Sequence, residues 1–223
     1  MPISVRLPDD SVRELRDGAT GADLAQGIGP KLFEASLAVR VDGRLQDLND
    51  PLPDGARVAL VTSKDPDSLE ILRHSTSHLL AQAVKRLFPE ARVGIGPVIE
   101  DGFYYDFQVE KFFTPEDLVA IEAEMRKITQ EGHAIVREVL DRDGAIARFQ
   151  SMGEPLKVEL ASDIPAGELI SGYRQGDFYD LCRGPHVPST AKLKAFKLLH
   201  VAAAYWRGNE KNAQLCRIYG TAF

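Results

Sequence analysis

The sequence predicts an α+β protein in which a small domain precedes a larger mixed α/β-sandwich domain with an antiparallel sheet. Short segments of alternating apolar and polar residues, arranged around one helix, occupy positions 1–62. Longer helical patterns alternate with strand patterns from residue 68 onward. Between them the polar run Ser63–Asp67 contains a proline and is typical of a linker. We therefore expect a first domain at 1–62, a linker at 63–67 and a second domain at 68–223.

The elements of the small domain have the order ββαββ. Thr20 with Asp23 three residues later has capping-box spacing and predicts a helix start. Asp42-Gly43 is a strong signal for a two-residue hairpin turn. The pattern is that of a ubiquitin-like β-grasp domain, and its expected elements are a strand from Ile3, a strand ending near Leu15, a helix ending near Gly27, a strand through Leu37, Val39 and Val41, and a strand over 57–62.

The larger domain begins with a helix after Ser68. Asp101-Gly102 predicts a hairpin turn, which places Tyr104 and Tyr105 on opposite faces of the strand that follows it. Thr114 opens a long amphipathic helix that Gly132 ends. The remaining expected elements are a strand at 134–140, a short helix at 144–152, a strand at 156–160 that carries Lys157, an extended segment at 177–181, a loop at 182–186, and strands at 195–207 and 214–219.

Two short motifs concentrate the reactive side chains. His74 and His78 are one helical turn apart and lie on a helix face away from the apolar arc, so we expect them to face a common target. Cys182 and His186 repeat the four-residue spacing in a glycine- and proline-containing loop. Histidines satisfied within a core, or a solvated polar face, are the structural alternatives. The second cysteine, Cys216, lies between apolar residues and is expected in the core as a free thiol.

Charge and composition bound the class of protein. The net charge is −6, but the segment from Leu181 onward carries seven basic residues and one acid, which makes it +6 and the remainder −12. Such asymmetry favours a polyanionic partner for the C-terminal part, the alternative being ordinary solvated positions. No run of about 18 apolar residues and no cleavable leader occurs, so we expect a cytoplasmic protein without membrane contact.

Five motifs together resemble a known family. They are Arg73–His78, Gly94–Pro97, Asp101–Asp106, Asp180–His186 and Tyr205–Gly208. In this order they closely resemble the N-terminal editing region of bacterial threonyl-tRNA synthetases, and the small domain resembles the TGS domain of the same family. The resemblance covers essentially the whole chain. The family's class II aminoacylation core, with its ATP and Mg²⁺ sites, would lie beyond Phe223, so the chain looks like a fragment.

The resemblance implies post-transfer editing. Threonine and serine differ by one methyl group, which a binding site distinguishes by only about 1–3 kcal/mol, so the parent ligase, which charges tRNA(Thr) with threonine using ATP, would sometimes load serine. An editing domain would hydrolyse seryl-tRNA(Thr) to serine and tRNA(Thr) with a positioned water. The implied partners are the tRNA(Thr) 3′ end and the seryl group. The family forms homodimers through the core that this chain lacks, so we expect a monomer.

The resemblance also assigns roles to residues. His74 would activate water or contact the ribose, and Lys157 would be its cationic partner, with the choice of proton acceptor left open. Asp180 would receive the substrate ammonium, and either Tyr104 or Tyr105 would contact the seryl group or the terminal adenosine. Further residues implied to line the substrate cavity are Gly96, His78, Cys182, Arg183 and His186.

The same inventory raises a question about metal. Three imidazoles and a thiolate suit tetrahedral Zn²⁺, so zinc at His74, His78, Cys182 and His186 is possible. The related alanyl-type domains use such a metal, whereas the resemblance to the threonyl type implies that editing requires no cofactor. Two other functions stay open: a zinc-dependent hydrolase of a small ester or amide, and a catalytically inert tRNA-docking module. Salt-sensitive tRNA binding would distinguish an editing domain from the small-molecule hydrolase. Serine release would distinguish it from the inert docking module.

Overall fold

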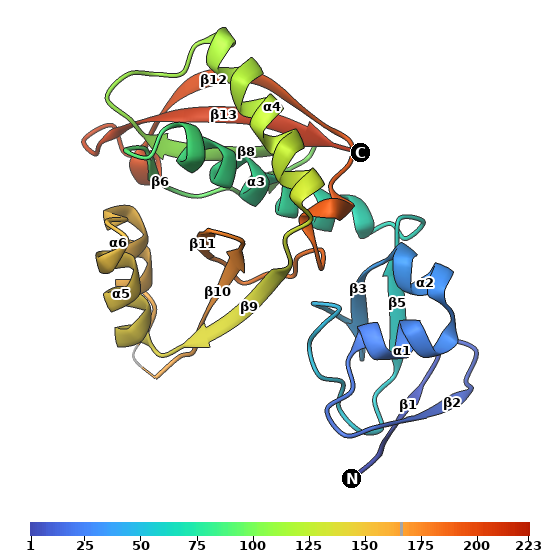
Figure 1. Ribbon diagram of the computed structural model, residues 1–223. Coiled ribbons are helices and arrows are strands. Elements are labelled where there is room, and N and C mark those ends of the chain that lie inside the picture. Colours follow the sequence, from blue (N-terminus) through green and yellow to red (C-terminus); the bar gives the residue numbers. More distant parts are fainter. Residues whose placement is uncertain (166) are drawn as a thin grey trace. The chain divides into compact units, whose positions relative to one another are not determined.

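The computed structural model describes residues 1–165 and 167–223. Its contacts divide the chain into two compact units, one of residues 1–71 with 184–188, the other of 72–183 with 189–223 (Figure 1). Helices and antiparallel sheets are present in both, which confirms the predicted α+β class. None of the helices in these described residues has the length and apolar character that a membrane crossing requires.

The first unit has the predicted order of strands and helix. Strands β1 and β2 pair antiparallel, and a second sheet has the order β4-β3-β5. A parallel bridge between Arg6 and Arg57, with the amide of Arg6 donating to the carbonyl of Ala56 at 2.9 Å, brings the first strand alongside the last. The elements are β1 (Ile3–Arg6), β2 (Val12–Leu15), α1 (Gly21–Ile28), α2 (Pro30–Ala35), β3 (Ser36–Val41), β4 (Arg44–Gln46) and β5 (Val58–Thr62).

Local sequence signals account for most of this unit. Thr20 and Asp23 form a complete capping box at the start of α1. Asp42 (φ 48°) and Gly43 (φ 84°) are both left-handed, as a two-residue hairpin turn requires. Helix α2 was not predicted, because six residues are too few for a helical period to show.

The second unit contains two antiparallel sheets. The larger has the order β12-β13-β8-β6 with β7 also paired to β8, and the smaller has the order β11-β10-β9. The elements are α3 (Ser68–Leu87), β6 (Arg92–Val93), β7 (Val98–Ile99), β8 (Gly102–Gln108), α4 (Pro115–Glu131), β9 (Ile135–Leu140), α5 (Arg142–Ser151), α6 (Pro155–Ser162), β10 (Ile170–Gln175), β11 (Phe178–Leu181), η1 (Thr190–Lys192), β12 (Phe196–Tyr205), η2 (Trp206–Gly208) and β13 (Gln214–Ala222).

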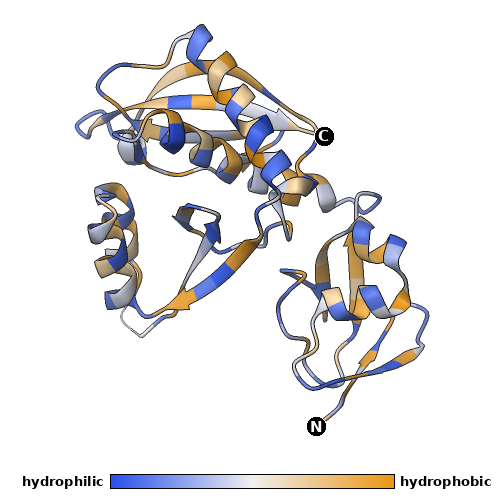
Figure 2. Ribbon diagram, viewed as in Figure 1, coloured by the Kyte–Doolittle hydropathy of each residue, from blue (hydrophilic) through white to orange (hydrophobic). Residues whose placement is uncertain are grey.

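Helix α4 packs on the larger sheet through one face. Thr114 and Asp117 form its predicted capping box, and Gly132 ends it with a left-handed φ of 67°. Its buried Glu122 accepts a hydrogen bond of 3.0 Å from the amide of Leu198 on β12. Figure 2 shows hydrophobic and hydrophilic stretches alternating along α4, as expected for a helix with one buried face. Cys216 on β13 is fully buried, which confirms its predicted place in the core.

The segment that carries Lys157 was predicted wrongly. Residues 155–162 form helix α6 and not a strand. The alternation of Leu156, Val158 and Leu160 imitated a strand, but Pro155 occupies the first helical turn, where proline's fixed φ favours a helix start. In the helix Lys157 is 2% exposed, whereas a strand lysine would be expected at the surface.

Helix α3 is covered by protein on both its polar and its apolar side. Every residue from Ser75 to Val84 is buried, so the polar and apolar sides are both covered. The larger sheet supplies one set of neighbours, with Tyr105 beside His78, and the smaller sheet the other, with Phe178 beside the same imidazole. The helix face that carries His74 and His78 is therefore not exposed to solvent. It faces a second layer of protein.

Candidate active site

A cavity of about 680 Å³ lies within the second unit and gathers most of the predicted site residues. Its size is within the range of small-molecule sites in proteins. Helix α3, the loop before β7, helix α6, and the ends of β10 and β11 form its walls. The lining residues are His74, His78, Ile95, Gly96, Pro97, Lys157, Leu160, Ile164, Glu168, Leu169, Ile170, Ser171, Asp180, Leu181, Cys182 and Arg183.

A buried ion pair forms one side of the cavity. The ammonium of Lys157 pairs with the carboxylate of Asp180, and these side chains are 2% and 1% exposed. The hydroxyl of Tyr105 donates to Asp180 and accepts from Lys157 at 3.1 Å. The amide of Leu181 donates to Asp180 at 2.8 Å. Each member therefore holds another, and the lysine cation is fixed at the cavity wall with little solvent to screen it.

Burial determines the charge of two of these groups. Desolvation, with smaller contributions from His74 and Lys157, lowers the pKa of His78 well below 6.5, so this imidazole is neutral at pH 7. Its Nδ1 lies 3.6 Å from an oxygen of Asp180. Desolvation and the neighbouring Asp180 raise the pKa of Tyr105 well above 10, so the phenol keeps its proton and remains a donor.

His74 on helix α3 and Cys182, just after β11, are in contact. The Nε2 atom of His74 is 3.1 Å from the Sγ atom of Cys182, a hydrogen-bond separation. Cys182 is partly exposed, and its amide and carbonyl both bond to Ser171 on β10. The rings of His74 and His78 are edge to face with centroids 5.4 Å apart. Helix α3 and the segment after β11 thus bring His74, His78 and Cys182 together, as the two motifs were expected to do.

Gly96 and Tyr105 fit closely together. A Cβ atom on Gly96 would lie 2.2 Å from a ring carbon of Tyr105, so no larger residue can occupy this position without displacing the ring. The hydroxyl of Ser77 lies 2.9 Å from the carbonyl oxygen of Gly96, which ties the loop to α3. Tyr104, on the opposite face of β8, packs under the guanidinium of Arg217 instead. Of the two tyrosines, Tyr105 is the one beside Lys157 and Asp180.

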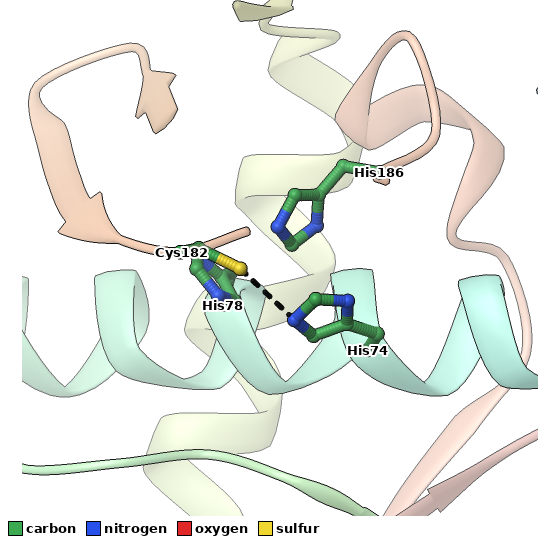
Figure 3. Close-up of side chains that lie close together, drawn as sticks. All are labelled: His74, His78, Cys182 and His186. Carbon is green, nitrogen blue, oxygen red and sulfur yellow. Dashed lines mark hydrogen bonds between the residues drawn. The ribbon is translucent and has the colours of Figure 1, made fainter. Parts of the chain in front are cut away.

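The four metal-type donors predicted from the sequence form one group. The ligand atoms of His74, His78, Cys182 and His186 all lie within 4.8 Å of one another (Figure 3). Their identities suit Zn²⁺, but the 3.1 Å between Nε2 and Sγ is shorter than the roughly 3.5 Å that two ligands of a tetrahedral zinc ion would show. This pair is arranged as a direct hydrogen bond.

Part of the positive charge of the basic C-terminal segment is paired within the fold. Lys197 pairs with Glu122, Arg207 with Glu159, and Arg217 with Asp106. Three of the seven cations that suggested a polyanion surface therefore have internal acidic partners. Arg183 differs from these three because it lines the cavity.

Ser77 and Ser171 were missed in the sequence. Each hydroxyl fixes a backbone carbonyl that belongs to the cavity wall, at Gly96 and Cys182 respectively. Ser77 lies inside the His74–His78 motif, and that position was the only signal available for it. Ser171 belongs to β10, a strand that was not predicted, so no local pattern pointed to it.

Comparison with known proteins finds family matches in two parts of the chain. Residues 3–62 match the TGS domain, and residues 170–219 match the threonyl and alanyl tRNA synthetase second additional domain. The chain is 56% identical over 223 residues to the threonine–tRNA ligase of Methylococcus capsulatus, covering 100% of this chain and 35% of that protein. It is 58% identical over 221 residues to the ligase of Geobacter sp. strain M21, covering 99% of this chain and again 35% of the relative.

The chain spans about a third of the length of the relatives it matches. Both matched regions come in the order expected from the sequence, and the identity extends over the whole chain. The predicted resemblance is thereby confirmed: the chain matches the TGS domain over residues 3–62 and the second additional domain over residues 170–219, and over its whole length it is homologous to the N-terminal third of bacterial threonine–tRNA ligases.

Proposed function

We propose that this chain is the editing part of a threonine–tRNA ligase and hydrolyses the ester of seryl-tRNA(Thr). The observation that carries the proposal is the cavity in which a buried lysine cation faces an imidazole–thiol pair. An aminoacyl ester is already activated, so its hydrolysis needs a positioned water, a proton acceptor and a positive charge near the departing ribose oxygen. Lys157 and His74 offer the last two within one cavity.

His74 is the proposed proton acceptor. Its side chain lines the cavity, and its Nε2 atom, which lies 3.1 Å from the Sγ atom of Cys182, would take the proton of a water that displaces this contact when substrate enters. His78 is neutral at pH 7 and therefore adds no charge that would compete with the lysine. Lys157, held by Asp180 and Tyr105, would stabilise the oxyanion that develops as water attacks and the ribose oxygen leaves.

The remaining predicted residues would bind the substrate. Asp180, the only carboxylate held beside Lys157 among the contacts described, would receive the serine ammonium in addition to its present partners. Gly96 contributes backbone to the cavity wall, and a Cβ atom there would lie 2.2 Å from a ring carbon of Tyr105, so this part of the wall is tightly packed and cannot easily yield. In the proposed sieve such a wall would exclude the threonine methyl group sterically, and steric exclusion discriminates more strongly than a lost contact does.

Editing by this site is proposed to need no metal. His74, His78, Cys182 and His186 are the residues that would hold Zn²⁺, and such an ion would act as a Lewis acid. Lys157 already provides a cation at the cavity wall, so the site has a charge for the developing oxyanion from the chain alone. Hydrolysis should therefore continue in the presence of a chelator, whereas a zinc-dependent hydrolase would lose activity.

The proposal extends to the partners of the chain. The 3′ end of tRNA(Thr) would enter the cavity, and a parent ligase of the kind found among the relatives would supply ATP-dependent charging in the cytoplasm. This chain would be a monomer, since dimerisation is expected to require the core that the matched relatives have beyond it.

Two substitutions test the proposal against an inert docking module. His74→Ala should abolish serine release from seryl-tRNA(Thr) while leaving tRNA binding nearly intact. Lys157→Ala should also abolish release, and because its ammonium pairs with the buried Asp180, the urea unfolding curve of this variant must show that the protein assayed is folded. His200→Ala is a matched control, because His200 is an exposed imidazole on β12 outside the cavity. Wild-type protein that binds tRNA but releases no serine above the background rate would rule out the proposed activity.

A further inference from the structure

Helix α3 carries a polar stripe that is longer than the two catalytic-site histidines. His74, His78, Gln82 and Arg86 follow one another at four-residue spacing, which places all four on one face of the helix. Gln82 is fully buried although its amide is polar. Such a group is retained in a core only if it is hydrogen-bonded, so its partners indicate what it does.

The partners of Gln82 lie at the tip of the β10–β11 hairpin. The amide of Gln175 donates to the Gln82 carbonyl oxygen at 2.6 Å, and the Gln82 amide donates to Asp177 at 2.7 Å. The guanidinium of Arg86 donates to the same carboxylate at 3.3 Å. Desolvation opposes, but these hydrogen bonds outweigh it and lower the pKa of Asp177, so the turn carries a negative charge at neutral pH.

The other end of the same hairpin forms the cavity. Ser171 is the second residue of β10, and Asp180 and Cys182 lie at the end of β11 and just after it, so both strands run between the Gln82 contact and the site. Helix α3 spans the same distance, from Gln82 back to His78 and His74. The position of the hairpin along the helix therefore sets the distances from Cys182 to His74 and from Asp180 to His78.

We propose that Gln82, Gln175 and Asp177 form a positioning cluster that fixes the hairpin along helix α3, and that the hydrolysis assigned above depends on it. None of the three lines the cavity, so they act through Asp180 and Cys182. The inference rests on the proposed function for its effect on hydrolysis, but its geometric part concerns only this chain.

The cluster is not arranged for stability alone. The side-chain oxygen of Gln175, Oε1, is buried without a hydrogen-bond partner among the described residues, which is a destabilising feature. Two apolar side chains of similar length would fill this space without leaving a polar atom unpaired. Apolar side chains could not fix the position of the hairpin along the helix in the same way. Hydrogen bonds are directional and favour one relative position of two elements, whereas apolar contacts permit several.

The test compares a double variant with a matched control. Gln82→Met/Gln175→Met replaces both amides by side chains of similar length, and Gln150→Met/Gln214→Met makes the same exchange at two exposed positions. Asp177→Ala is a second variant, chosen because the Asp177 side chain is 62% exposed and its removal leaves the core intact. Serine release from seryl-tRNA(Thr), alkylation of the thiol by iodoacetamide, and the thermal midpoint are measured for each.

The alkylation rate of the Cys182 thiol measures the geometry of the site in the absence of tRNA. The chain has two cysteines, and Cys216 is fully buried, so reaction of the folded protein occurs at Cys182. Its rate depends on the neighbouring His74, because an adjacent imidazole favours the reactive thiolate. If wild-type protein releases no serine, the proposed function fails, while the alkylation rates still decide the geometric inference.

We expect the double methionine variant to keep its thermal midpoint within about 3 °C of wild type. Serine release should fall about 10- to 100-fold, the effect of displacing catalytic groups by roughly 1 Å, and alkylation should slow several-fold. Asp177→Ala should move both rates in the same direction, and the exposed control should move neither. Wild-type rates of release and alkylation in the double variant would overturn the inference, as would losses that merely follow a lowered midpoint.

Discussion

Replacing Lys157 by methionine should destabilise the second unit strongly. Lys157 and Asp180 are 2% and 1% exposed, so removal of the ammonium leaves a largely desolvated carboxylate without its cationic partner. Breaking a buried pair in this way costs about 3–5 kcal/mol. Tyr105 and the amide of Leu181 still donate to Asp180, which places the expected cost toward the lower end of that range.

The double variant Lys157→Met/Asp180→Asn distinguishes the contribution of the paired charges to stability from the contribution of side-chain packing. The asparagine oxygen can accept the hydrogen bond from the amide of Leu181, and its NH2 group can donate to the hydroxyl of Tyr105, which loses its Lys157 donor, so no charge is left. We therefore expect the double variant to recover about 2–3 kcal/mol of the loss, because no unpaired charge remains. A recovery of this size is a coupling energy between the two side chains.

Urea unfolding monitored by tryptophan fluorescence measures these differences directly. Trp206 is the single tryptophan of the chain, and it packs on Leu156 of helix α6 next to Lys157, so its signal follows the second unit. The reasoning is refuted if Lys157→Met costs less than about 1 kcal/mol, the value of an exposed ion pair. It is refuted equally if the two substitutions are additive.

Three further predictions concern other parts of the fold. The pKa of His78 is lowered in the folded chain, so the free energy of unfolding should be retained above about pH 6.5 and fall by up to about 1.4 kcal/mol per pH unit below it. Urea curves at pH 7 and pH 5 should show this fall, and His78→Asn should remove the pH dependence. Gly96→Ala places a Cβ atom 2.2 Å from the Tyr105 ring and should cost about 1–3 kcal/mol with a loss of serine release; unchanged stability and release would contradict the close fit. Thr114→Ala removes the capping box of α4 and should cost about 1 kcal/mol in the same urea assay, while Thr114→Ser should retain most of it.

Elements with a strong local signal were predicted well. The capping boxes at Thr20 and Thr114, the Asp42-Gly43 turn and the stop at Gly132 each depend on contacts within a few residues, and each is present. Helix α6 was missed because eight residues hold only two helical turns, and the strand-like alternation was read in preference to Pro155.

The site itself depends on contacts between distant parts of the chain. Lys157, Asp180 and Tyr105 come from a helix and two strands, and nothing in the neighbourhood of each residue indicates that they meet. The resemblance to threonyl-tRNA synthetases singled them out. A helical wheel likewise placed His74 and His78 on one face but could not show that the same face is covered by the β10–β11 hairpin, nor that Gln82 continues the stripe.

Side-by-side incubation of the chain with seryl-tRNA(Thr) and threonyl-tRNA(Thr) tests the central claim most directly. If the cavity is a sieve that holds serine and excludes the threonine methyl group, the seryl ester should disappear much faster than the threonyl ester, with and without a chelator. Equal loss of the two esters, or loss of neither beyond the rate in buffer, would contradict the assignment of this site to editing.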